Sequence, residues 1–244
     1  MLKRIIRNIL TTIGLDLTKN LKYDRMTTQI MEKVIAVNSN CVDVGCHKGE
    51  MLDLMLKYAP QGQHYAFEPI PAMFDTLKAK YTKNNIHLFS CALSDKKGIT
   101  TFNYVKNAPA YSGIMKRRYD VKHPDIEEIN VKLDLLDHLI PKDQTIKFIK
   151  IDVEGAEYGV LRGAKNILSK DKPYVVFEFG LGASDYYKTT PQMIYQLLVE
   201  ECGLQISNLN DWIKHNPPLS LEKFAAAYQN SQEYYFLAHP DKVS

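Results

Sequence analysis

Cysteine is scarce and scattered in this sequence. The four cysteines stand at positions 41, 46, 91 and 202, and none forms a CxxC pair. Neither a zinc ribbon nor a disulfide framework is therefore expected, and we interpret the cysteines as reduced thiols in the core or along a site. No apolar run reaches the roughly 18 residues that would predict a transmembrane helix. A formal net charge of only +3, with no Lys/Arg block beside aromatic residues, argues against nucleic acid as a partner.

The N-terminal stretch also lacks the features of a secretory signal. Residues 1–14 are basic and apolar, but Arg7 and Asn8 interrupt the apolar stretch and no small-residue cleavage site follows. Apolar side chains recur there at helical spacing: Leu2, Ile5, Ile6, Ile9 and Leu10.

Two interpretations of that pattern stay open. The helix could lie on an anionic membrane surface, or it could pack on its own domain or on a partner subunit, which would make a homodimer. We expect residues 1–25 to form an amphipathic helical extension. The protein is expected in the cytoplasm, either free or peripheral at the inner face of the membrane.

From residue 26 onward, apolar runs alternate with helical patterns. Buried strands are predicted at 40–44, 63–68, 86–90, 146–151 and 173–179. Helices are predicted at about 49–59, 71–83, 157–170 and 190–202. This rhythm predicts an α/β fold with a parallel sheet, in a single domain over residues 26–244.

Several segments depart from the simple alternation. Residues 99–105 and 128–134 alternate in polarity and predict an inserted strand pair, and 205–209 with 234–239 predict a final pair. The connections 106–127 and 210–232 are long, which is typical of functional loops.

The sequence has no G-x-G-x-x-G fingerprint of a dinucleotide site. The first predicted strand instead ends in Asp43-x-Gly45-x-x-x-Gly49. A carboxylate at that strand end suits a cationic amine, not a diphosphate. Glu68 ends the second strand about 20 residues later, where an acid can accept both hydroxyls of a ribose. A nucleoside that carries an amino acid and no phosphate fits these features, and that ligand is S-adenosylmethionine.

Three carboxylates, Asp152, Glu154 and Glu157, follow the predicted strand 146–151. Open α/β sheets bind ligands outside the carboxyl ends of their parallel strands, so the cluster is a candidate site. The simpler interpretation is the acidic first turn of a helix, which the helix dipole alone would favour. The second acid-bearing strand end, at Asp43, favours the functional interpretation.

Together these motifs resemble the FkbM family of S-adenosylmethionine-dependent methyltransferases. The matching segments, in family order, are DVGCHKG at 43–49, FEPIP at 67–71, ALSD at 92–95, KLD at 132–134, IKIDVEGAE at 149–157, VLRGA at 160–164 and the strand that ends in Glu178. The resemblance implies a Rossmann-like class I methyltransferase fold, with a seven-stranded, mostly parallel sheet, an antiparallel last strand and an inserted strand pair. The family turn often reads Gly-Ala-Asn, whereas this chain has Gly45-Cys46-His47.

The resemblance also implies a cofactor site for S-adenosylmethionine. Its expected residues come from the first turn and the following strand ends: Asp43, Gly45, Cys46, His47, Gly49, Glu68, Pro69, Ser94, Asp95 and Asp152. Asp95 could equally be a turn former in SerAspLysLysGly.

Methyl transfer to a hydroxyl requires an aligned acceptor and a group that takes its proton. Asp152 is the predicted catalytic group, with Glu154 and Glu178 beside it. Three converging carboxylates would also suit a divalent cation. Because no diagnostic ligand spacing occurs, no metal is expected.

The acceptor is expected to be a small molecule or glycan that is O-methylated, most simply a sugar. Its predicted contacts lie in the two long connections: Tyr111, Ser112, Arg117, Arg118 and Trp212. The alternative is that these tyrosines pack on the domain and the cations are only solvated. Two other functions stay open, a nicotinamide-dependent oxidoreductase and a catalytically silent, methyltransferase-like interaction module.

Overall fold

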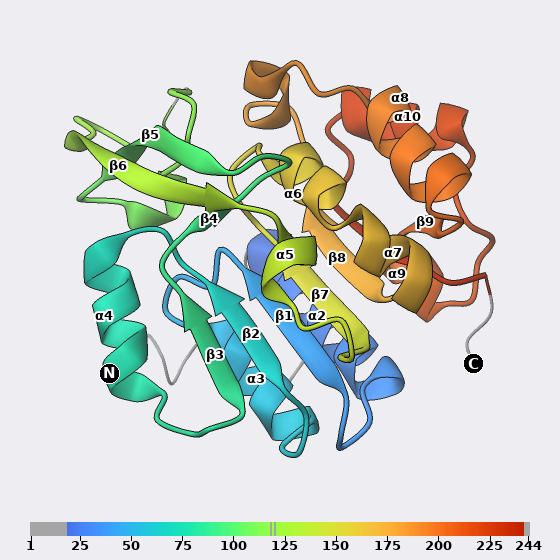
Figure 1. Ribbon diagram of the computed structural model, residues 1–244. Helices are drawn as coiled ribbons and strands as arrows, with labels where there is room; N and C mark the ends of the chain where they lie inside the picture. The colour runs from blue at the N-terminus through green and yellow to red at the C-terminus, as the bar shows by residue number, and fades with distance from the viewer. Residues whose placement is uncertain (1–18, 118, 120, 242–244) are drawn as a thin grey trace.

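The computed structural model describes residues 19–117, 119 and 121–241. Its main sheet has seven strands in the order β3-β2-β1-β7-β8-β10-β9 (Figure 1). These are β1 (Asn40–Val44), β2 (His64–Phe67), β3 (Ile86–Phe89), β7 (Ile146–Ile151), β8 (Tyr174–Glu178), β9 (Gln205–Asn208) and β10 (Tyr235–His239). The strands from β3 to β8 pair in parallel, whereas β10 is antiparallel to both β8 and β9. The predicted sheet with its antiparallel last strand is confirmed.

A second sheet is inserted between β3 and β7. It has the order β4-β6-β5 and consists of β4 (Ala92–Leu93), β5 (Gly98–Val105) and β6 (Ile126–Asp134). Strands β5 and β6 are antiparallel along their whole length, from Gly98 opposite Leu133 to Val105 opposite Ile126. The predicted strand pair is thus confirmed, with the short β4 as a third member.

Helices cover both faces of the main sheet (Figure 1). On one face lie α2 (Lys19–Val34), α3 (Glu50–Tyr58) and α9 (Leu209–Ile213). On the other lie α6 (Glu157–Gly163), α7 (Lys165–Asp171), α8 (Pro191–Tyr195), the π-helical turn Gln196–Glu201 and α10 (Leu221–Gln229). Two further helices, α4 (Pro71–Lys80) and α5 (Leu136–Leu139), flank the sheet. Successive strand residues point to opposite faces, so Val42 and Val44 pack under α6 and α7 while Cys41 faces α2.

Helix α2 crosses the boundary expected between residues 25 and 26. Tyr23 and Met26 are both 3% exposed and pack with Ile30 in the core beneath the sheet. Residues 19–25 are therefore part of the domain and do not belong to a separate extension. The helix and membrane contact predicted for residues 1–14 lie outside the described residues. Within the described part of the chain, no helix combines the length and apolarity needed to cross a bilayer.

The site expected from the sequence lies at the topological switch point of the sheet, where the strand order reverses. Strands β2 and β3 extend it on one side of β1, whereas β7 and β8 extend it on the other. Open α/β sheets bind ligands at such a switch point, outside the carboxyl ends of the strands.

Candidate active site

A cavity of about 230 Å³ opens at the carboxyl ends of β1, β2 and β7. Asp43 of β1 and Lys150 of β7 lie side by side in the parallel register, and Asp152 follows two residues later on the same face. Tyr235 of β10 also lines the cavity, and α2 contributes Tyr23. Polar side chains from distant parts of the chain therefore meet on the α2 side of the sheet.

The turn after β1 depends on glycine at position 45. Gly45 has a φ of +74°, and a Cβ atom there would stand 2.0 Å from the backbone oxygen of Asp152. Only glycine permits this conformation and this close approach of the two backbones. Gly49 has a different role: it precedes α3 with a φ of +76°, and a Cβ there would meet the Tyr81 hydroxyl at 2.3 Å. Gly49 is not among the residues that line the cavity.

Asp43 is the most completely buried acid of the cavity lining. It is 0% exposed, and neither carboxylate oxygen has a hydrogen-bond partner of regular geometry within the described residues. Burial raises the pKa of Asp43 to about 6, while the Lys150 ammonium and the nearby Leu52 amide oppose the rise. A buried carboxylate without a regular partner calls for a donor group from a ligand.

Glu68 links the ends of β1 and β2. Its two oxygens accept the backbone N–H groups of His47 at 2.9 Å and of Ile70 at 3.0 Å. Burial raises the pKa of Glu68 to about 7, partly offset by those two amides. Glu68 also lines the cavity, and a carboxylate has lone pairs left for ligand hydroxyls after two such bonds. Three other residues predicted for the cofactor line the cavity as well: Cys46, His47 and Pro69.

Ser94 and Asp95 do not reach the cavity. The Ser94 backbone oxygen lies so close to α6 that a Cβ on Gly163 would be 2.1 Å from it, and Asp95 approaches Arg162 at 3.4 Å. This packing against α6 turns both residues away. The cavity is lined instead by the three preceding residues, Cys91, Ala92 and Leu93.

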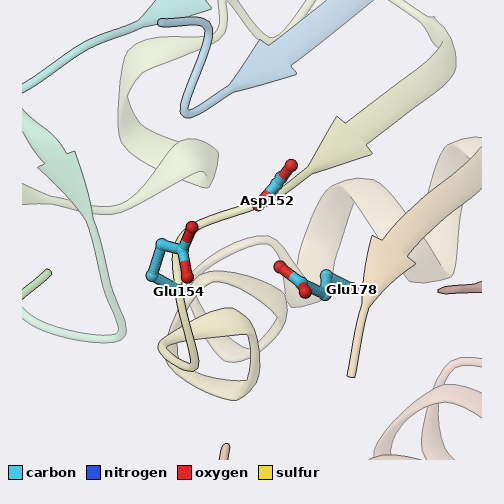
Figure 2. A group of neighbouring side chains, drawn as sticks. All are labelled: Asp152, Glu154 and Glu178. Atoms are coloured by element: carbon cyan, nitrogen blue, oxygen red, sulfur yellow. The ribbon is translucent and has the colours of Figure 1, made fainter. Parts of the chain in front are cut away.

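Asp152, Glu154 and Glu178 converge from two neighbouring strand ends. Figure 2 shows Asp152 and Glu154 on the segment that follows β7, and Glu178 at the end of β8. One carboxylate oxygen from each residue lies within 4.8 Å of the other two. The Asp152 Oδ2 atom accepts hydrogen bonds from Lys150 Nζ at 3.0 Å and Tyr235 Oη at 2.7 Å. The predicted catalytic residues are thus brought together.

The three acids do not share one protonation state. Although burial opposes ionisation of Asp152, the Lys150 ammonium and the Tyr235 hydroxyl lower its pKa to about 2. Burial and the Asp152 charge raise the pKa of Glu154 to about 8, against the opposing effect of Arg117. The same two causes raise the pKa of Glu178 well above its usual value. Ionisation is therefore favoured at Asp152 and disfavoured at Glu178 beside it.

Glu157, the third acid of the sequence motif, supports the segment between β7 and α6. It is 1% exposed, and its Oε1 atom accepts the backbone N–H groups of Val153 and Gly155, both at 3.1 Å. Burial raises its pKa to about 7 despite those bonds. Glu157 therefore fixes the backbone that carries Asp152 and Glu154.

The acid cluster has the donor chemistry of a divalent-cation site, but protein cations already contact it. Lys150 is bound to Asp152, and Arg117 forms an ion pair with Glu154. These contacts compensate part of the negative charge that a metal ion would neutralise. The site can keep its acids together without a metal.

The residues predicted to contact the acceptor are dispersed. Ser112 lines the cavity, but its hydroxyl accepts the Val105 N–H at 2.9 Å and so holds the loop. Arg117 pairs with Glu154 and lies 5.2 Å from the centre of the Tyr111 ring, and Tyr111 does not line the cavity. Arg118 lies outside the described residues.

Trp212 is far from the cavity and packs in the core. It is 8% exposed and meets the ring of Tyr174 edge-on, with 5.7 Å between the ring centres. Tyr174 begins β8, whereas Glu178 ends it, so Trp212 lies at the opposite end of the strand from the acid cluster. Segment 210–232 is mostly helical, in α9 and α10, and α10 packs on the other face of the sheet.

Several residues of the cavity lining were not predicted, and three of them have polar side chains at its centre or wall: Lys150, Tyr235 and Tyr23. Lys150 had a signal in the sequence, because a lysine inside a buried strand needs an acid as partner. The two tyrosines had none, since only the antiparallel β10 and the crossing of α2 bring them to the cavity. Their ring centres lie 5.0 Å apart, and we call this pair the tyrosine wall.

The described residues fit S-adenosylmethionine. Asp43 offers a buried carboxylate to an amino group, Glu68 faces the cavity with free lone pairs for ribose hydroxyls, and Gly45 leaves room for a ligand to approach the turn. These residues can hold the amino-acid and ribose parts of the cofactor with the side-chain positions that they already have.

Comparison with known proteins agrees with this geometry. The model of the family described as "Methyltransferase FkbM domain" matches residues 43–206. Methyltransferase sdnD of Sordaria araneosa is 27% identical over 156 residues, which cover 52% of this chain and 60% of that protein. The 2-O-methyltransferase NoeI of Sinorhizobium fredii is 26% identical over 169 residues, covering 64% of this chain and 68% of that protein.

A crystal structure of a methyltransferase FkbM from Methylobacillus flagellatus shares the fold. Its TM-score is 0.52 at 16% identity, over 97% of this chain and 60% of that one. Methyltransferase 1 of Beauveria bassiana is also similar, at 27% identity over 145 residues, 52% of this chain and 58% of that protein. The chain thus spans less than two thirds of several of these relatives.

Proposed function

Because the chain belongs to the FkbM methyltransferase family, we propose that it transfers the methyl group of S-adenosylmethionine, its cofactor, to a hydroxyl of a sugar or glycan. The nicotinamide-dependent oxidoreductase considered from the sequence is wrong, since the family match covers both the glycine turn and the acid-bearing strand end. The name of NoeI, a 2-O-methyltransferase, supports oxygen as the acceptor atom.

The position and hydrogen bonds of Asp152 are the observation that carries this proposal. Its side chain is 26% exposed, it lines the cavity, and Lys150 and Tyr235 hold one of its oxygens. The bound cofactor supplies a methyl group that is already activated. The protein then has to align the hydroxyl, exclude water and receive the hydroxyl proton.

Asp152 suits the last of these tasks although its pKa is low. A hydroxyl oxygen that has gained a methyl group is strongly acidic, so a weak base can take its proton as the carbon–oxygen bond forms. Before that moment, Asp152 would accept a hydrogen bond from the hydroxyl and orient its lone pair. Because burial and the Asp152 charge raise the pKa of Glu178, Glu178 would add little negative charge beside Asp152.

The cavity lining favours a neutral polyol as acceptor. The tyrosine wall offers aromatic surface of the kind that packs on a sugar face, and α2 adds Asp24 and Thr27 as hydrogen-bonding groups. Lys116, a cation of the loop between β5 and β6, pairs with Glu128 at 2.5 Å and is not among the residues that line the cavity. An acceptor with its own phosphate would also meet the Asp152 charge.

Transfer of labelled methyl from S-adenosylmethionine to a panel of neutral glycans tests the proposal. We expect label in the glycan fraction, in a bond that resists the mild base hydrolysis that cleaves methyl esters. The Asp152→Asn variant should reduce turnover by roughly 10²–10⁴-fold, the usual contribution of a positioned base.

Asp75→Asn is the matched control, because Asp75 is exposed on α4. It should transfer methyl at the wild-type rate. Transfer to no glycan, or an Asp152→Asn variant with wild-type turnover, would refute the proposal. In the first case a silent interaction module would become the better account of this fold.

A further inference from the structure

Segment 109–117 lies in the long connection between β5 and β6 and forms part of the cavity lining. Its contribution consists of Pro109, Ala110, Ser112 and Ile114. The segment belongs to the inserted sheet, whereas the acids of the site lie at strand ends of the main sheet, and Figure 1 shows the two sheets. The cavity is therefore complete only while the segment and those strand ends are held together.

One side of the segment is attached to its own sheet. Asn103 of β5 and Gly113 exchange backbone hydrogen bonds of 2.8 and 3.2 Å, and the Ser112 hydroxyl accepts the Val105 N–H. These bonds hold the segment to β5 but do not connect it to the strand ends that carry the acids.

The other side of the segment contacts the loops that follow β7 and β8. Gly113 packs directly on Glu154, since a Cβ there would lie 3.6 Å from the Glu154 Cβ atom. The Met115 N–H donates to the Tyr187 hydroxyl at 3.0 Å, and Arg117 donates to Glu154 Oε2. Hydrogen bonds from a charged group are the stronger kind, so the bond from Arg117 contributes most to this set of contacts.

Arg117 is well buried but does not face the cavity. Its side chain is 11% exposed, it also donates to the Gly182 carbonyl at 3.4 Å, and it is not among the residues that line the cavity. Glu154, which does line it, can accept the Arg117 bond whether or not its carboxyl group is ionised. Arg117 can therefore act on a molecule in the cavity only through the residues that it holds.

The backbone at Glu154 makes it a rigid partner for Arg117. Glu154 has a φ of +59°, which is uncommon for a residue with a side chain. Gly155 follows with a φ of +104°, and a Cβ there would stand 2.6 Å from the backbone oxygen of Ala183. Because this close packing fixes the turn, the position of Glu154 determines where segment 109–117 is held.

We infer that Arg117 is a positioning residue for methyl transfer, which acts through Glu154 to hold segment 109–117 over the acid cluster and so completes the compartment for the acceptor. The acceptor role rests on the proposed function. The sequence led us to expect that Arg117 touches the acceptor directly, and the inference replaces that contact with an indirect one. Loss of Arg117 should then loosen the segment and weaken binding of the acceptor, while the cofactor contacts at Asp43 and Glu68 stay in place.

Limited proteolysis with a lysine-specific endoprotease tests the holding contact without any ligand. The target is the bond after Lys116, whose side chain is 63% exposed. For each variant, the cleavage rate in buffer is divided by the rate in urea, which corrects for the changed sequence. Arg117→Ala should raise this ratio roughly tenfold or more, because the segment opens more often.

Two further variants show whether the contact with Glu154 is responsible. Glu154→Ala should raise the ratio as Arg117→Ala does, and the double variant should raise it no further, since both changes remove the same contact. Glu127→Ala is the matched control. It removes the exposed pair of Glu127 with Lys106 in the same connection, and exposed pairs contribute little, so the ratio should stay at the wild-type value.

Kinetics with a neutral glycan that the wild-type protein methylates tests the acceptor role. Arg117→Ala should raise the acceptor KM roughly tenfold, while the dissociation constant of S-adenosylhomocysteine stays unchanged. Arg117→Lys should recover part of the loss, because it keeps the charge but not the forked donor group. A residue that only supported the fold would lower the amount of active enzyme and leave the acceptor KM as it is.

The possible results separate the two parts of the inference. Cleavage ratios that stay at the wild-type value in Arg117→Ala and Glu154→Ala would overturn the holding contact. A normal acceptor KM in Arg117→Ala, or weaker binding of S-adenosylhomocysteine instead, would overturn the acceptor role. If the wild-type protein methylates no glycan, the proposed function fails and the acceptor role with it, whereas the proteolysis still decides whether Arg117 holds the segment.

Discussion

Replacing Gly45 by alanine should destabilise the protein and disturb the site together. The added Cβ would lie 2.0 Å from the Asp152 backbone oxygen, whereas ordinary contacts start about 1.4 Å further out. Strands β1 and β7 would have to separate there, at the expense of the bond from the Asp152 N–H to the Val44 oxygen, now 3.1 Å long. The left-handed backbone alone costs a non-glycine residue about 1–2 kcal/mol.

When the costs of separating the two backbones and of losing this hydrogen bond are added to that conformational cost, we expect a decrease of about 3–5 kcal/mol in the free energy of unfolding. Gly182→Ala is the matched control. Its φ is +94°, but a Cβ there would have nothing within 4 Å, so only the conformational part of about 1–2 kcal/mol should appear.

Urea unfolding followed by circular dichroism measures both variants, and titration with S-adenosylhomocysteine follows the site. Gly45→Ala should bind the ligand more weakly because Asp152 and the turn move apart, whereas Gly182→Ala should bind it normally. Equal losses of stability in the two variants would refute the reasoning, since the close approach to Asp152 would then contribute nothing.

Three further expectations follow from the site. Glu68→Gln should weaken binding of S-adenosylhomocysteine by about 1–3 kcal/mol in a calorimetric titration, and Glu68→Ala should also lower stability because the His47 and Ile70 amides lose their acceptor; unchanged affinity in both folded variants would contradict the ribose role. Methyl transfer should persist in EDTA because Lys150 and Arg117 already contact the acids, and activity that disappears with EDTA and returns with Mg²⁺ would show a metal site at Asp152, Glu154 and Glu178. Finally, the free energy of unfolding of the ligand-free protein should fall as pH rises from about 5 to 8. The pKa of Glu157 is about 7 in the folded protein, above its value in the unfolded chain. The contribution of Glu157 to stability is therefore complete below the unfolded pKa and is lost as pH rises to 7, a decrease of about 3 kcal/mol. Urea titrations at several pH values should show this decrease, with a shallower one in Glu157→Gln, and a flat profile would contradict it.

The parts of the fold with a local signal were predictable from the sequence. Most strands of the main sheet are short, largely apolar runs, and the acids at positions 43, 68 and 152 lie at or just after the ends of such runs. Because parallel strands bring their carboxyl ends to one edge, the meeting of these acids could be expected from the sequence. The inserted pair β5 and β6 also has a local signal, because each of its two segments alternates between apolar and polar residues.

The sequence could not show the direction of a side chain where tertiary packing decides it. Ser94 and Asp95 follow a strand as Asp43 and Glu68 do, but the contact with Gly163 turns them towards α6. Trp212 is of a residue type that often binds sugars, and only its contact with Tyr174 shows that it packs in the core. The boundary placed after residue 25 falls within α2, which is continuous from Lys19 to Val34.

The tyrosine wall has a consequence for biosynthesis. Tyr23 comes from the first helix described and Tyr235 from the last strand, which must insert between β8 and β9 before the two rings can meet. The Gly45 turn and Glu68, in contrast, lie within the first third of the chain. While a nascent chain emerges from the ribosome, the elements that would hold the nucleoside are made early, but the surface that would receive the acceptor is finished only when β10 is released. A truncated or stalled chain would therefore expose an incomplete half-site with no place for a hydroxyl, and would be unable to transfer a methyl group.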